Sequence, residues 1–149
     1  MTTLSEICTI TSSKRIFRSD YQEVGVPFYR GREIIEKHKG KTKLTAELYI
    51  SEDKFNEIKN KFGAPKKGDL LLTSVGTIGI PYVVKEEDRF YFKDGNLTWF
   101  KDFKNTNSNY LYYWIISPLG KAQLKMATIG TSQSALTIVL LKRLVIDLP

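Results

Sequence analysis

Short apolar and aromatic runs, separated by turn residues, mark the middle of the chain. The runs occupy residues 70–72, 82–84, 90–92 and 97–100. Between them lie Gly-rich or charged segments that are typical of tight turns. This alternation predicts a mostly antiparallel sheet, and residues 8–11 and 144–148 add strand-like segments near the two ends.

Before this region the pattern is less regular. Residues 24–31 indicate a turn that leads into a short strand ending at Arg30, and the next clear element begins at Ser51. Residues 51–62 have helical spacing, with Ser51 as the N-cap and Gly63 as the stop. The apolar side chains of this helix share one stripe, which is expected to face the core: Phe55, Ile58 and Phe62.

Helical patterns return near both ends of the chain. Thr3 and Glu6 have the spacing of a capping box, which predicts a short first helix. Residues 109–116 predict an aromatic-rich helix packed in the core, and Ser117-Pro118 ends it while starting the next helix. Residues 137–142 predict a final helical turn or two. The elements together predict one α+β domain over residues 1–149, with a mostly antiparallel twisted sheet flanked by short helices and no internal linker.

Composition narrows the class of protein. The chain has 149 residues, of which 42% are hydrophobic and 26% charged, as in ordinary globular domains. No apolar run is long enough for a membrane span, so no membrane partner is expected. The first residues lack a basic flank followed by an apolar core, and Cys8 is the single cysteine. Both features favour a cytoplasmic location.

Charge narrows the class of binding partner more than composition does. The formal net charge is +7, and residues 103–146 contain five basic residues and no carboxylate. Within this part lies a small polar segment at residues 130–134, flanked by helical patterns. A cationic surface with hydroxyl and amide side chains favours a nucleic-acid partner.

Catalytic constellations are not expected. His38 is the only histidine and lies in a Lys-rich segment, where we expect it to be solvated rather than catalytic. One His and one Cys do not make a zinc site, and the sequence has no phosphate-binding loop or dinucleotide-binding glycine turn. We therefore expect no enzyme activity, no metal and no cofactor in this chain.

Two other functions remain open. Gly76-Thr77-Ile78-Gly79 fits the Gly-x-x-Gly loop of some RNA-binding domains, although it joins strand-like runs and reads more simply as a tight turn. Asp69 and Asp94 lie at strand edges and are the candidate ligands of a metal-dependent nuclease, although both also fit turn positions.

Several segments in fixed order resemble the target recognition domain of the specificity subunit of type I restriction-modification enzymes. The match includes a Gly-hydrophobic-Pro-aromatic-x-Arg stretch that ends at Arg30. The matching segments are residues 4–8, 25–31, 67–74, 76–79, 111–114, 117–120, 130–136 and 146–149.

The resemblance implies a domain that reads one half of a split double-stranded DNA target. It implies methyltransferase subunits that carry S-adenosylmethionine, restriction subunits, and a second recognition domain or a second copy of the chain as partners. The family's long spacer helix would begin where this sequence ends, so the chain resembles an isolated recognition domain, a piece of a longer subunit or a half-length subunit.

Side chains for DNA were assigned by their chemistry, because basic groups suit phosphates and polar loop groups suit base edges. Arg30 has an alternative, which is an ion pair with Glu33. The expected phosphate contacts are Lys14, Arg15, Arg18, Lys66, Lys67 and Lys104. The expected base contacts are Arg30, Ser74, Thr77, Thr131, Ser132 and Gln133.

Overall fold

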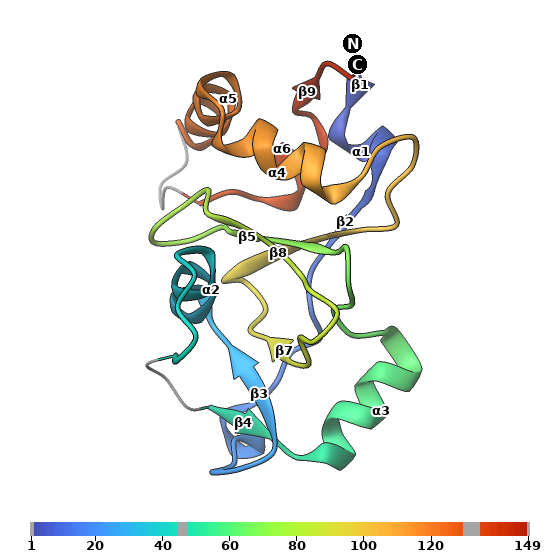
Figure 1. Ribbon diagram of the computed structural model, residues 1–149, viewed down its shortest axis with the longest axis vertical. Helices are drawn as coiled ribbons and strands as arrows, with labels where there is room; N and C mark the ends of the chain where they lie inside the picture. Colours follow the sequence, from blue (N-terminus) through green and yellow to red (C-terminus); the bar gives the residue numbers. More distant parts are fainter. Residues whose placement is uncertain (1, 45–47, 130–134, 149) are drawn as a thin grey trace.

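The computed structural model describes residues 2–44, 48–129 and 135–148, which form helices and strands in mixed order (Figure 1). None of the helices in these three ranges is long and apolar enough to cross a membrane. The strands are β1 (Thr2–Thr3), β2 (Thr9–Thr11), β3 (Val26–Tyr29), β4 (Tyr49–Ile50), β5 (Leu70–Thr73), β6 (Pro81–Val83), β7 (Tyr91–Phe92), β8 (Leu97–Lys101) and β9 (Val145–Ile146). The helices are α1 (Leu4–Ile7), the 3-10 helix η1 (Arg18–Asp20), α2 (Gly31–His38), α3 (Glu52–Phe62), α4 (Ser108–Ile116), α5 (Pro118–Thr128) and α6 (Ile138–Lys142).

A four-stranded antiparallel sheet with the order β2-β8-β5-β6 forms the centre of the molecule. Its inner strand β5 is buried on both faces, which explains why residues 70–72 are a continuous apolar run. In the register of β5 with β8, Leu70 pairs with Phe100 and Leu71 with Trp99. Since side chains alternate along a strand, the first pair faces one core and the second pair the other.

The helices α1, α4, α5 and α6 cover one face of this sheet (Figure 1). Leu111 and Ile115 of α4, Leu124 of α5 and Leu141 of α6 pack against the Leu70 side of the sheet. The pairing of β1 with β9 closes this layer and places the two ends of the chain side by side.

The opposite face carries α2 and a second apolar cluster. Ile34 of α2 packs with Leu71, Tyr82, Phe92 and Trp99 in this cluster. Below it, a small sheet of order β4-β3-β7 packs against Phe55 and Ile58 of α3.

Most expected elements are confirmed. The Glu6 carboxylate accepts a hydrogen bond from the Thr3 amide at the start of α1. Ser51 caps α3, which ends at Gly63 with a φ of 86°. Ser117 ends α4, and its hydroxyl accepts from the Gly120 amide at the start of α5. The mixed helix and strand class and the mainly antiparallel pairing are also as expected.

Two expectations about the fold are wrong, and one helix was not anticipated. Residues 31–38, for which the sequence pattern predicts no element, form α2. The strand β7 leaves the central sheet and pairs parallel with β3. Phe62 is 50% exposed, because it lies at the last turn of α3, where the Nζ atom of Lys14 is 4.4 Å from its ring centroid.

The junction of α4 and α5 depends on a glycine. A Cβ atom at Gly120 would lie 1.9 Å from the carbonyl oxygen of Trp114, so the two helices can approach this closely only if residue 120 has no side chain. A Cβ atom at Gly31, at the start of α2, would have no heavy atom nearer than the Thr73 methyl at 4.0 Å.

We therefore expect Gly120→Ala to lower the free energy of unfolding by about 1–3 kcal/mol or more, since the added methyl group overpacks the helix junction. The matched variant Gly31→Ala is expected to stay within about 1 kcal/mol of the parent. Urea denaturation followed by circular dichroism measures both. Equal stability of the two variants would contradict the packing argument.

Candidate nucleic-acid interface

Three elements that are distant in sequence meet at one edge of the central sheet. The start of α2, the loop joining β5 to β6, and the turn before β8 surround a surface hollow of about 630 Å³. In Figure 1 this edge is on the left, with α2 below the β5–β6 loop and α5 above it. The hollow is lined by Arg30, Gly31, Arg32, Ile35, Glu36, Lys41, Val75, Thr77 and Asn96.

Arg30 is held at this edge by a buried carboxylate. Its Nε atom lies 3.2 Å from Oε1 of Glu33, and its Nη2 atom lies 3.4 Å from Oε2. The Arg30 backbone amide also donates to Oε1 at 2.7 Å, so Glu33 caps α2 as well. Glu33 is 1% exposed, whereas the Arg30 side chain is 33% exposed. The ion pair anticipated as the alternative for Arg30 is therefore present, and it uses the Nε and Nη2 atoms of the guanidinium.

The β5–β6 loop is a tight turn with two glycines in left-handed conformations. Gly76 has a φ of 70° and Gly79 a φ of 89°, which residues with side chains rarely adopt. Thr73 ties the loop together, because its carbonyl oxygen accepts from the Gly79 amide and its Oγ1 accepts from the Ile80 amide. Thr77 is exposed at the tip of this loop and lines the hollow.

Asn96 completes the hollow from the other side. It directly precedes β8, and its carbonyl oxygen accepts from the Ser74 amide at 2.9 Å, which fixes its backbone against the end of β5. Its side chain makes no hydrogen bond with any residue in the described ranges. Asn96 could not be singled out from sequence, because its place beside Arg30 and Thr77 depends on the strand register.

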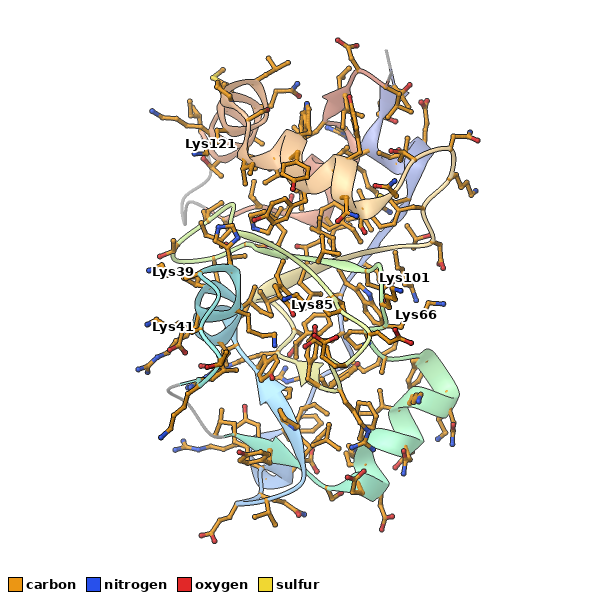
Figure 2. All side chains as sticks on the ribbon, viewed as in Figure 1. Lys39, Lys41, Lys66, Lys85, Lys101 and Lys121 are labelled. Atoms are coloured by element: carbon orange, nitrogen blue, oxygen red, sulfur yellow. The ribbon has the colours of Figure 1, made fainter. Side chains whose placement is uncertain are left out.

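This edge carries more exposed cations than carboxylates. In residues 30–44, 74–80 and 117–129, all of which the structure describes, the only acids are Glu33 and Glu36, at 1% and 7% exposure, and the turn before β8 adds the half-buried Asp94. A second hollow continues the surface from the β5–β6 loop to Lys121 and Lys125 of α5. Figure 2 shows Lys39, Lys41 and Lys121 on this side of the molecule. We call this surface the basic edge; its exposed cations are Arg32, Lys39, Lys41, Lys43, Lys121 and Lys125.

Comparison with known proteins gives the family. The family model of the type I restriction modification DNA specificity domain matches residues 1–149. The chain belongs to this family. It is 32% identical over 113 residues to a putative type I restriction enzyme specificity subunit, S.HindORF215P, of Haemophilus influenzae, a match that covers 74% of the chain and 27% of that protein.

Solved structures share the fold of this specificity domain at low sequence identity. A chain from a structural study of complex assembly and conformational transition of the type I R-M system has a TM-score of 0.64 at 17% identity, over 96% of this chain and 32% of that one. The S subunit from M. genitalium has a TM-score of 0.60 at 16% identity, and the match covers 96% of this chain and 32% of that one. The HsdS subunit from Thermoanaerobacter tengcongensis has a TM-score of 0.57 at 16% identity, and the match covers 96% of this chain and 31% of that one. The chain therefore spans about a third or less of the length of these relatives.

The expected DNA-contacting residues of the specificity domain fall into separate places. Arg30 and Thr77 meet at the basic edge. Thr131, Ser132 and Gln133 lie outside the described residues, although the Leu136 amide donates to the Ser74 carbonyl oxygen at 2.9 Å next to the β5–β6 loop.

The base contact expected for Ser74 is wrong. Ser74 is 3% exposed, and its hydroxyl lies 2.6 Å from Oγ1 of Thr98 and 3.1 Å from the Leu72 carbonyl oxygen. The side chain links β5 to β8 inside the sheet, because it follows the alternation of the strand inward. The sequence could not separate this position from the exposed turn that follows it.

The expected phosphate contacts are exposed but lie away from the basic edge. Lys14 covers the Phe62 ring, and Lys67 lies 4.0 Å from Glu86. Figure 2 shows Lys66 at the edge opposite Lys39, Lys41 and Lys121. Contacts of this group with DNA stay a prediction; its members are Lys14, Arg15, Arg18, Lys66, Lys67 and Lys104.

His38 is not solvated as expected. It lies at the end of α2, with Nδ1 2.8 Å from the Pro81 carbonyl oxygen and 3.3 Å from the Tyr112 hydroxyl. Since a carbonyl oxygen only accepts, Nδ1 carries the proton in the first contact. His38 therefore joins α2 to the edge strand β6. The segment was misjudged because α2 was not recognised.

Asp69, a candidate metal ligand in the nuclease interpretation, is a buried structural residue. Its Oδ2 accepts from the Trp99 indole at 2.9 Å and from the Lys66 amide at 3.1 Å. Among the described residues no three His, Cys, Asp or Glu side chains are grouped closely enough to hold a metal ion. Cys8 is also buried, which raises the pKa of its thiol to about 12.

Burial raises the pKa of Asp69 above its ordinary value, and this outweighs the lowering by its hydrogen bonds and by Lys66 and Lys101. A carboxyl group whose pKa is higher in the folded state destabilises the fold once it ionises. We expect Asp69→Asn to gain stability relative to the parent as the pH rises from 3 through the folded pKa. Urea denaturation at pH 3.5 and pH 7 measures this difference, and a variant that loses relative stability at pH 7 would contradict it.

Proposed function

We propose that this chain recognises a short, specific stretch of double-stranded DNA and acts as the half-site reader of a type I specificity subunit. The observation that carries the proposal is the basic edge, where exposed cations surround a polar hollow and the carboxylates of Glu33 and Glu36 are buried. Such a surface attracts the phosphates of DNA whatever the base sequence is. Polar side chains in the hollow can reach the base edges. Family membership supports the same function.

The partners follow from the proposal. Methylation and cleavage belong to methyltransferase and restriction subunits, and S-adenosylmethionine binds to the methyltransferase. A second recognition domain, or a second copy of this chain, reads the other half of the target. The assembly works in the cytoplasm, where chromosomal and incoming DNA are both accessible.

The direct test is binding of the purified chain to duplexes selected from a randomised pool, with and without the methyltransferase subunit that it accompanies. The proposal expects an enriched sequence and an affinity that falls steeply with salt. Single-stranded RNA serves as the competitor. Preferential binding of RNA, or no enrichment of any duplex in either arm, would overturn the proposal.

The contribution of the basic edge is tested by the double variant Lys121→Ala/Lys125→Ala. Each lost phosphate contact lowers the slope of log affinity against log salt by about 1, so we expect a decrease of about 2 and an equal loss on all duplexes. The matched variant Lys66→Ala/Lys67→Ala removes the same charge from the opposite edge and is expected to change the slope less. If only the second variant changes the slope, DNA binds the opposite edge.

A further inference from the structure

Two of the three cations that line the hollow at the basic edge have a carboxylate beside them. Arg30 is paired with Glu33, and Lys41 lies 4.0 Å from Glu36. Arg32 is the third cation of the lining. A phosphate gains little from such a lining, whereas the uncharged edge of a base can use both its donors and its acceptors.

Asn96 has the free chemistry for this contact. Its amide offers two N–H donors and a carbonyl oxygen that accepts, and no other described residue uses them. Its backbone is fixed at the start of β8 by the hydrogen bond from Ser74. A side chain on a fixed backbone loses less freedom on binding than one on a mobile loop, so its preference for a partner is sharper.

The guanidinium of Arg30 is also held in place, in this case by Glu33. Glu33 occupies the Nε side of the group, through Nε and one hydrogen of Nη2. The opposite side keeps one N–H on each Nη atom, and these two donors are parallel. This spacing matches two acceptors on one base, such as O6 and N7 of guanine.

We propose, resting on the proposed function, that Asn96 is a specificity-determining residue of this chain: it reads an adenine edge in the major groove from the hollow at the basic edge. Arg30, positioned by Glu33, reads a neighbouring guanine. Arg32 on the rim binds a phosphate and carries no sequence information.

The experiment compares duplex pools selected by the parent chain and by variants at this hollow, each checked for thermal stability. Asn96→Ala is expected to lose the preference at one position, and to bind the parent's selected duplex roughly ten- to a hundredfold more weakly. Its affinity for unrelated duplexes is expected to stay within about twofold. Asn60→Ala, on the exposed face of α3, is the matched control and is expected to select the parent sequence.

Two further variants separate reading from general attraction. Asn96→Asp replaces the amide donor by an acceptor, so the preference at that position is expected to move from adenine toward cytosine, whose N4 group donates. Arg30→Lys keeps the charge but removes the fork, and is expected to relax an adjacent guanine position. Arg32→Ala is expected to lower the affinity for all duplexes by the same factor.

The outcomes distinguish the inference from the proposed function. If the parent chain selects a sequence and Asn96→Ala and Asn96→Asp both select the same one, the inference is wrong while DNA recognition stands. If the parent selects no sequence at all, both are wrong. A change at one position in the Asn96 variants, with stability and nonspecific affinity retained, supports both.

Discussion

The antiparallel pairing of β5 with β8 is the constraint on which the rest of the structure depends. It is the innermost contact of the central sheet, and its register decides which side chains of each strand face the helices and which face α2. The same register sets Thr73 opposite Leu97, so the residues that follow β5 and precede β8 emerge at one edge. The hollow is therefore a direct product of strand pairing, although its residues come from three distant parts of the chain.

The arrangement separates the buried core from the surface that is proposed for recognition. The apolar residues of β5 and β8 are buried on both faces, and the polar residues begin within one position of the strand ends. Ser74 and Thr98 form a buried polar link at this end of the two strands, and Val75 after Ser74 and Asn96 before β8 line the hollow. Side chains at the edge can thus change without disturbing the core, while their backbones stay fixed by the sheet.

The strands were predictable from sequence because each is a short apolar run bounded by turn residues, and the helices with clear caps were predictable for local reasons too. The helix α2 was missed because its start is capped by the side chain of Glu33, and its apolar face is little more than Ile34 and Ile35. Arg30 and Thr77 are chosen from the sequence by residue type, and the structure brings both to the hollow, while their contact with DNA stays a prediction. Asn96 and the burial of Ser74 were not predictable, because both depend on how β5 aligns with β8.

The pairing of β1 with β9 holds residues near the two ends of the chain next to each other, with Thr2 opposite Ile146. The chain therefore enters and leaves the fold at the same place, the β1–β9 pair. A different set of residues between the paired ends would leave the distance between Thr2 and Ile146 unchanged, as long as β1 still pairs with β9.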